Sequence, residues 1–349
     1  MTRRTLLAGA AFEQQTLRLP RKIRLGMIGL EGHIGEILTP LKLLPDVEIV
    51  AACDADERAM GRLKRVPNAA QIRFYKDYRQ LLAREKPDMA AVGGPNGSRA
   101  AIILACAERK LHVVAEKPLA IERPDLERIR RAVAANGIRL TMLLPMRFSP
   151  AYLAMRQIVA AGEIGEVAQM GAQKSYKLGE RPEWMRHRAS FGGTIPYIGV
   201  HMIDLMRFIG GRDMVEVAAF QNRIGFPELG DMENTTSTIF RLDNGGTAAL
   251  RMDYLRPETA PTHGDDRLRL AGTGGVLEFQ AATGVTLITR KEKPRTITAL
   301  PAGRSLFVDF LESVYQGKSH ALPLADIYRV NEIVLAAREA AERRQVVRV

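Results

Sequence analysis

The sequence has few cysteines and no long apolar run, and these absences exclude several classes of protein. Its 349 residues include only two cysteines, Cys53 and Cys106, each in apolar surroundings. Both are interpreted as small core residues, which argues against a disulfide framework and favours a reducing compartment. No apolar stretch reaches the length of a membrane-spanning helix, so no membrane partner is expected. The six histidines form no metal-spaced cluster, and no metal is expected.

Acidic residues are also in the minority, at 39 against 51 lysines and arginines, which gives a net charge of +12. A strongly basic chain is a candidate for nucleic-acid binding. The basic residues are scattered, however, without zinc-finger spacing or an aromatic RNA-binding motif, so no nucleic-acid partner is expected. The positive charge is better explained by composition alone. The alternative is that it attracts anionic substrates and a pyrophosphate.

Residues 1–21 are predicted to form a flexible tail. They contain Arg3-Arg4 before a short apolar run, which is similar to the start of a twin-arginine export signal. The run ends at Glu13, before any convincing cleavage region. A cytoplasmic location is therefore expected, with periplasmic export as the alternative.

Residues 22–145 show strands alternating with helices, which predicts an α/β domain with a parallel sheet and right-handed crossovers. Apolar runs and turn residues mark strands at 23–29, 47–53, 89–92, 111–115 and 139–144, and helices at 35–44, 98–109 and 124–136. Another short helix ends near 85–86. This pattern is typical of a dinucleotide-binding Rossmann domain.

The first strand runs into a glycine turn, Gly29-Leu30-Glu31-Gly32-His33-Ile34-Gly35. Glycine allows a tight turn and a close approach to a pyrophosphate. The turn departs from the usual G-x-G-x-x-G because Glu31 stands at the second glycine. Asp54 ends the second strand, where an acid grips the ribose hydroxyls and repels a 2′-phosphate, so NAD is favoured over NADP. The alternative is that Asp54 caps the following helix.

Two more turns follow predicted strands. Gly93-Gly94-Pro95-Asn96 offers small residues and a proline, which let the backbone pass close to a flat ring. Glu116-Lys117-Pro118 follows a buried strand, and ligands of open parallel sheets bind just outside such strand ends. The proline restrains the backbone, so Lys117 is predicted to point into a cleft. The alternative is a surface lysine.

With these motifs, the chain from about Lys22 to its C-terminus resembles the glucose-fructose oxidoreductase / inositol dehydrogenase / rhizopine-catabolism (Gfo/Idh/MocA) oxidoreductase family. The Glu-Lys-Pro element carries most of this resemblance. Members commonly have a histidine three residues after the Pro-Asn pair, where this chain has Arg99. The resemblance implies an NAD cofactor, with NADP less favoured, contacted by Gly29, Gly32, His33, Ile34, Asp54, Gly94, Pro95, Asn96, Glu116 and Lys117.

Residues 146–349 are predicted to form a second, α+β domain with a large, mainly antiparallel open sheet. Consecutive β segments are predicted at 167–175, 215–222, 235–241, 247–254, 267–271, 275–280 and 285–289, and turns such as Asp243-Asn244-Gly245-Gly246 suggest hairpin connections. Helices are predicted at 305–316 and 324–344, the last packing back on the first domain. The resemblance implies self-association through one sheet face, as a dimer or tetramer.

The catalytic residues are expected around Tyr197 and His201, which share a face if they lie on one helix. The resemblance implies an acid–base set of lysine, aspartate and histidine, in which Tyr197 replaces the aspartate here. Lys117, His201 and Tyr197 are thus the catalytic candidates, and Lys117 is expected to lower the pKa of Tyr197. The alternatives are that Tyr197 only lines the site and that His201 is a packed or capped histidine.

The resulting hypothesis is an NAD(P)-dependent oxidoreductase that moves hydride between nicotinamide and a sugar, polyol or related hydroxy compound. Trp184 either stacks on the substrate or anchors its loop. Two alternatives stay open, an NAD-assisted glycoside-cleaving enzyme without net redox change and a non-catalytic NAD-binding regulator. The expected substrate contacts are Lys117, Arg147, Tyr176, Trp184, Tyr197 and His201.

Overall fold

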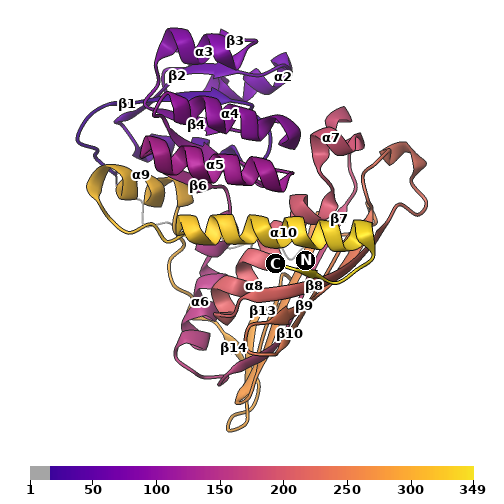
Figure 1. Ribbon diagram of the computed structural model, residues 1–349. Helices are drawn as coiled ribbons and strands as arrows, with labels where there is room; N and C mark the ends of the chain where they lie inside the picture. Colours follow the sequence, from indigo (N-terminus) through magenta and orange to yellow (C-terminus); the bar gives the residue numbers. More distant parts are fainter. Residues whose placement is uncertain (1–15) are drawn as a thin grey trace.

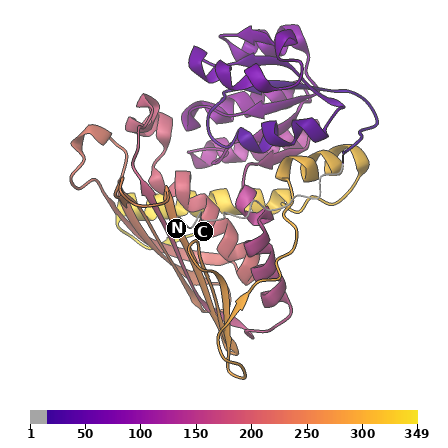
Figure 2. The same ribbon diagram turned by 180° about the vertical axis from the view of Figure 1, so that it is seen from behind.

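The computed structural model describes residues 16–349 and contains two sheets with helices between and around them (Figures 1 and 2). The Arg3-Arg4 pair lies outside the described residues. No helix of residues 16–349 is long and apolar enough to span a membrane.

The first sheet has six parallel strands in the order β3-β2-β1-β4-β5-β6, the order of a Rossmann fold. This confirms the predicted fold class. Apart from the edge strand β3, which is mostly exposed, the strands are largely apolar because helices cover both faces. They are β1 (Ile23–Ile28), β2 (Val47–Cys53), β3 (Arg73–Tyr75), β4 (Met89–Val92), β5 (His112–Ala115) and β6 (Leu140–Met142).

The helices of this half differ from prediction mainly after the glycine turn. Instead of one helix there are four α-helical residues and then a 3-10 turn, because Pro40 has no amide hydrogen to continue the α-helix. The helices are α1 (Gly35–Leu38), η1 (Thr39–Leu43), α2 (Glu57–Met60), η2 (Gly61–Arg65), η3 (Ala69–Gln71), α3 (Tyr78–Glu85), α4 (Asn96–Glu108) and α5 (Arg123–Asn136).

The second sheet has nine strands in the order β14-β13-β12-β11-β7-β10-β9-β8-β15. Every pairing is antiparallel except that of β7 with β10, so the prediction of a mainly antiparallel sheet is confirmed. The strands are β7 (Val167–Lys177), β8 (Met214–Asn222), β9 (Thr235–Leu242), β10 (Thr247–Arg256), β11 (Gly264–Gly272), β12 (Gly275–Gln280), β13 (Gly284–Thr289), β14 (Arg295–Ile297) and β15 (Val347–Arg348).

Helices cover one face of this sheet and leave the other open (Figure 2). The helical elements of residues 145–349 are η4 (Pro145–Phe148), α6 (Pro150–Ala160), η5 (Glu183–Arg186), α7 (Arg188–Phe191), the π-helical turn η6 (Ile195–Gly199), α8 (Val200–Gly210), η7 (Pro227–Leu229), α9 (Leu306–Gln316) and α10 (Leu324–Arg343). The proposed domain boundary between residues 145 and 146 falls in η4.

Helix α10 lies between the two sheets (Figure 1). Its apolar stripe is buried, as its helical spacing predicts. Toward the first sheet, the Asn331 side-chain oxygen accepts the amide hydrogen of Leu119 at 2.9 Å. Toward the second sheet, Arg329 donates to the carbonyl of Met214 at 2.9 Å. The last helix therefore connects both halves close to the Glu116-Lys117-Pro118 turn.

Candidate active site

Three turns meet at the carboxyl ends of β1, β4 and β5, where the strand order reverses. We call residues 29–35, 93–96 and 116–118 the Rossmann wall. Gly29 has a φ of +78°, and a Cβ there would lie 2.6 Å from the Gly93 backbone. A Cβ on Gly32 would lie 2.5 Å from the Glu116 carboxylate. Both positions therefore require glycine, because the three turns approach one another more closely than a side chain permits.

Asp54 lies at the end of β2 and faces the glycine turn. Its carboxylate accepts the amide hydrogens of Leu30 at 2.7 Å and of Asp56 at 2.8 Å. Asp56, rather than Asp54, caps α2, so the alternative of Asp54 as a helix cap is wrong. Arg62 donates to the Leu30 carbonyl at 2.6 Å. This arginine was not expected here, and it places a cation beside the turn that Asp54 holds.

Glu116 joins β5 to the glycine turn. Its carboxylate accepts the backbone amide of His33 and contacts the His33 ring nitrogen at 2.8 Å. Burial alone would raise the pKa of Glu116, but the charge and hydrogen bond of His33, with the charges of Lys117 and Arg99, lower it to about 2. Glu116 is thus a buried carboxylate that stays ionised.

Arg99 stands where relatives commonly have histidine, and it is 2% exposed. Its guanidinium donates to the Pro118 carbonyl and to the Gly94 carbonyl, both at 2.7 Å. Burial lowers the pKa of Arg99 to about 10. The side chain therefore ties the β4 and β5 turns together and positions the backbone on which Lys117 stands.

Lys117 is 4% exposed, so the alternative of a surface lysine is wrong. Its Nζ donates to the Tyr197 carbonyl at 2.9 Å and lies 3.4 Å from the centroid of the Tyr197 ring. Burial lowers the pKa of Lys117 to about 7; the charge of Glu116 opposes this shift, and those of Arg99, Lys174 and Arg181 add to it. Lys117 can therefore exchange a proton near neutral pH.

Tyr197 lies in the π-helical turn η6, and His201 lies in the first turn of α8. The Tyr197 ring contacts Lys117 and the His201 ring lies 5.1 Å from that of His33, so both side chains lie against the Rossmann wall. The expected fall in the tyrosine pKa is wrong. Burial, with the charge of Glu116, raises the pKa of Tyr197 to about 12. Lys117 lies over the ring face, which leaves the phenol protonated at neutral pH.

His201 is 5% exposed, and its Nδ1 is buried without a hydrogen-bond partner in residues 16–349. Burial, together with the charges of His33, Lys117 and Lys174, lowers its pKa well below the usual value. The imidazole is therefore neutral near pH 7. It is neither a capped histidine nor one whose hydrogen-bonding groups are satisfied by packing.

The facing side of the site comes from the helix-covered face of the second sheet. On the neighbouring strands β11, β7 and β10, polar and aromatic side chains replace the apolar ones at one end of that face. Lys174 and Asp266 are cross-strand partners, 2.7 Å apart, and the Lys174 ammonium also donates to the Tyr176 hydroxyl at 2.6 Å. We call these residues the sheet wall: Lys174, Tyr176, Arg181, Tyr254 and Asp266.

Sequence analysis missed Lys174, although a signal was present. Residues two apart on a strand share a face, and Lys174 continues a row that begins with the buried Met170 and Ala172. A lysine at such a position is 1% exposed here. Burial lowers the pKa of Lys174, and the charge of Asp266 opposes that shift.

Two expected substrate residues have other partners. Arg147 is 2% exposed, and its guanidinium pairs with Asp204 at 3.1 Å and with Asp326 at 2.9 Å. Its expected role as a substrate contact is wrong, because η4 directs the side chain toward α8 and α10. Trp184 donates its indole hydrogen to Glu31 at 2.9 Å, which anchors its loop to the Rossmann wall. Burial raises the pKa of Glu31.

The Rossmann wall has the groups that a dinucleotide needs. Within residues 16–349, the amides of Gly32 and Ile34 donate to no other group, so they are available to phosphate oxygens. Those of Leu30 and His33 are already held by Asp54 and Glu116. Asp54 keeps lone pairs for ribose hydroxyls, since a carboxylate accepts about four hydrogen bonds. The residues present therefore fit NAD(P).

This fold and wall define an oxidoreductase with an NAD-binding Rossmann domain. Residues 23–143 match the family model for the NAD-binding Rossmann fold of this oxidoreductase family, and residues 152–278 match the model for the Gfo/Idh/MocA C-terminal domain. The chain belongs to the Gfo/Idh/MocA oxidoreductase family, as its motifs predicted.

Known proteins agree with this assignment. A Thermotoga maritima structure classed as an oxidoreductase is 32% identical, with a TM-score of 0.87 over 94% of this chain and 100% of its own. Myo-inositol 2-dehydrogenase from the same species is 25% identical over 78% of this chain and 79% of its own. D-xylose 1-dehydrogenase (NADP(+)) 2 from Haloferax volcanii is 26% identical over 74% of this chain and 76% of its own.

Proposed function

We propose that this protein is an NAD(P)-dependent dehydrogenase or reductase whose substrate is a sugar, a polyol or a related hydroxy compound. The observation that carries this proposal is the place of Lys117. Its amine lies buried at the strand-order reversal, between the glycine turn and the Tyr197–His201 segment. Relatives named as inositol and xylose dehydrogenases support the substrate class.

Lys117 is the proposed acid–base group. Bound nicotinamide supplies the hydride acceptor or donor. In the oxidative direction the substrate hydroxyl gives its proton to the neutral Lys117 amine while the C–H bond of the same carbon releases hydride. General acid–base catalysis works best when the pKa of the group lies near the operating pH, as that of Lys117 does. Tyr197 and His201, both uncharged near neutral pH, would orient the hydroxyl by hydrogen bonding.

NAD is the proposed cofactor, with NADP less favoured. The Asp54 carboxylate favours ribose hydroxyls and repels a 2′-phosphate. Arg62 lies on the other side of Leu30 and weakens that repulsion. Preference for NAD therefore depends on the balance between these two charges.

The test is an assay of the purified protein with NAD or NADP against a panel of sugars and polyols. We expect reduced nicotinamide to appear in proportion to the oxidised product, and Lys117→Met to abolish it. Product formed without net reduced nicotinamide would instead indicate glycoside cleavage. A protein that retains bound nucleotide but turns over no hydroxy compound would contradict the proposal.

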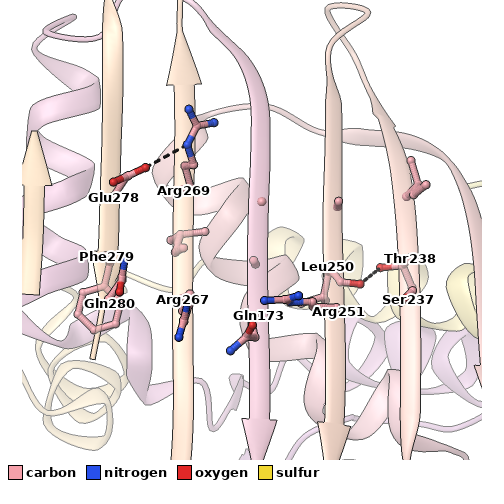
Figure 3. Close-up of a pocket in the computed structure, with 15 residues that line it drawn as sticks. Gln173, Ser237, Thr238, Leu250, Arg251, Arg267, Arg269, Glu278, Phe279 and Gln280 are labelled. Carbon is pink, nitrogen blue, oxygen red and sulfur yellow. Dashed lines mark hydrogen bonds and ion pairs between the residues drawn. The ribbon is translucent and has the colours of Figure 1, made fainter. Parts of the chain in front are cut away.

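The open face of the second sheet is the proposed surface for self-association, as a dimer or tetramer. A shallow hollow there is lined by side chains from β7, β9, β10, β11 and β12, including Arg251, Arg267 and Glu278 (Figure 3). Ile239 and Phe220 are 61% and 70% exposed. We expect Ile239→Asp to lower the mass measured by light scattering, whereas Leu300→Asp, at an exposed loop, would not. An unchanged mass in the first variant would contradict this surface.

A further inference from the structure

Arg181 is a cation without a carboxylate partner beside the candidate active site. It lies in the loop between β7 and η5, and its guanidinium carbon is 4.5 Å from the centroid of the Tyr254 ring. One terminal nitrogen donates to the Lys177 carbonyl at 3.2 Å. Its Nε is buried without a partner, and no carboxylate of residues 16–349 lies within the 4.0 Å of an ion pair.

The carboxylates of two neighbouring residues are already paired with other cations. Asp266 pairs with Lys174 at 2.7 Å. Glu233 pairs with Arg188 and also accepts the Thr194 amide at 3.0 Å. With these pairs neutral, Arg181 leaves an unbalanced positive charge on this wall, since its guanidinium is a cation.

Buried polar atoms of the sheet wall and of His201 also lack partners. The Tyr254 hydroxyl, on a side chain 2% exposed, has no hydrogen-bond partner within residues 16–349. The same is true of His201 Nδ1 and of Asp266 Oδ1. Buried polar groups are nearly always hydrogen-bonded, so unpaired ones gathered at one site indicate a missing ligand. The Tyr254 hydroxyl can donate a hydrogen bond and Asp266 Oδ1 can accept one, which suits a ligand rich in hydroxyl groups.

We propose that the substrate is a sugar acid, such as a uronic or aldonic acid, and that Arg181 binds its carboxylate. This rests on the proposed function. The planar fork of a guanidinium matches the two oxygens of a carboxylate. A phosphate monoester carries nearly two negative charges at neutral pH, and a wall with a single unbalanced cation suits it less well. The hydroxyl groups of the same molecule would meet the unpaired atoms near Tyr254 and His201.

The first experiment compares kcat/KM for D-glucuronate with D-glucose and for D-galacturonate with D-galactose. We expect the wild-type protein to prefer the acid of each pair. Loss of a hydrogen bond to a charged group costs about 1.5–3 kcal/mol, or roughly 10–100-fold. We therefore expect Arg181→Gln to reduce that preference by roughly this factor, and Arg181→Lys to retain part of it.

Arg186→Gln is the matched control, because Arg186 lies in the same region but pairs with Glu183 at 3.2 Å on the surface. It should leave the preference unchanged. If neutral sugars are turned over and the acids are not preferred, the sugar-acid inference fails while the proposed function stands. Preference for D-glucose 6-phosphate over D-glucuronate would also overturn it.

Binding is measured separately from turnover. Trp184 is the only tryptophan of the chain, and its ring lies 6.2 Å from that of Tyr197, so its fluorescence reports on this site. With NAD present, we expect D-glucuronate to change the fluorescence of both the wild-type protein and Lys117→Met, but with an affinity roughly 10–100-fold lower in Arg181→Gln. Equal affinity in the wild-type protein and Arg181→Gln would overturn the inference, even if no substrate is turned over.

Discussion

The two walls of the site differ in how far charged side chains bridge their segments. On the Rossmann wall, Glu116 contacts His33 and Arg99 bridges two turns. On the sheet wall, Arg181 has no carboxylate and the Tyr254 hydroxyl has no partner among residues 16–349. The bridging side chains keep the Rossmann wall in shape without a ligand, whereas the Tyr254 hydroxyl of the sheet wall gains a hydrogen bond only when a ligand binds. The first therefore suits a cofactor common to a family, and the second suits a particular substrate.

Lys117→Met is expected to have the largest effect on kcat, because it removes the amine at which the two walls meet. Removing a general acid–base group lowers kcat by roughly 10²–10⁴-fold. NAD binding, measured by calorimetry, should persist because the turn amides and Asp54 remain. Lys291→Met, at an exposed turn, serves as the control. If the Lys117→Met variant turns over substrate within a few-fold of the wild-type rate, Lys117 is not the acid–base group.

Arg147→Met examines a residue that belongs to neither wall. Breaking one partner of a buried ion pair typically costs about 3–5 kcal/mol in the free energy of unfolding. We expect a loss of this size in urea denaturation, most of it regained in the double variant Arg147→Met/Asp204→Leu. If stability is unchanged while KM for the sugar rises, Arg147 would after all belong to the substrate side.

Asp54→Ser removes the carboxylate that accepts the Leu30 amide in the glycine turn of the Rossmann wall. Hydrogen bonds to a charged group contribute about 1.5–3 kcal/mol, so affinity for NAD should fall by roughly 10–100-fold. Affinity for NADP should rise, because Arg62 then faces the 2′-phosphate without an opposing carboxylate. Asp56→Ser, which removes only the cap of α2, is the matched control. An unaltered ratio of the two affinities would exclude Asp54 from the ribose site.

The pH dependence follows from the lowered pKa of Lys117. Below about 7 the amine is protonated and cannot accept a proton, so kcat/KM for oxidation should rise through pH 7 to a plateau. For reduction the sign reverses, and the rate should fall as pH rises. His201→Gln should lower the rate without moving the midpoint, since the pKa of His201 lies well below 7. Loss of the inflection in this variant would mean that His201, and not Lys117, is the group whose titration controls the rate.

Tyr254→Phe is expected to have the smallest effect on stability, and it tests the sheet wall directly. A buried hydroxyl without a partner costs about 1–3 kcal/mol, so its removal should leave the ligand-free protein equally stable or more stable. The same change should lower kcat/KM for the substrate. A clear loss of stability without ligand would mean that the hydroxyl is already paired in the folded protein.

Sequence patterns predicted most of the fold, because β1, β4, β5 and β6 are largely apolar runs that lead into glycine or proline turns. They also placed Lys117 at a strand end, where topology decides the environment. Short elements such as α2 and β15 (Val347–Arg348) were not predicted, since β15 is held by its pairing with β8 rather than by its own sequence. Local patterns carry no information on such distant partners.

The same limit explains the errors within the site. Arg147 pairs with Asp204, 57 positions later, and nothing near either residue indicates the pairing. The pKa of Tyr197 depends on its burial in the folded protein and on the charge of Glu116, 81 positions earlier in the chain. Lys174 could have been found from the alternation of β7, whereas the unpaired state of Arg181 required knowing the position of every neighbouring carboxylate.

The hydrogen bond from the Leu119 amide to Asn331 has a consequence for biosynthesis. The two residues are 212 positions apart, and Leu119 stands two residues after Lys117. During translation, the first sheet can form long before its lysine turn receives this last support. A polypeptide that terminates prematurely before α10 would thus be able to hold nucleotide while its reactive amine remained unsecured. Completion of synthesis, rather than formation of the nucleotide domain, would mark the onset of activity.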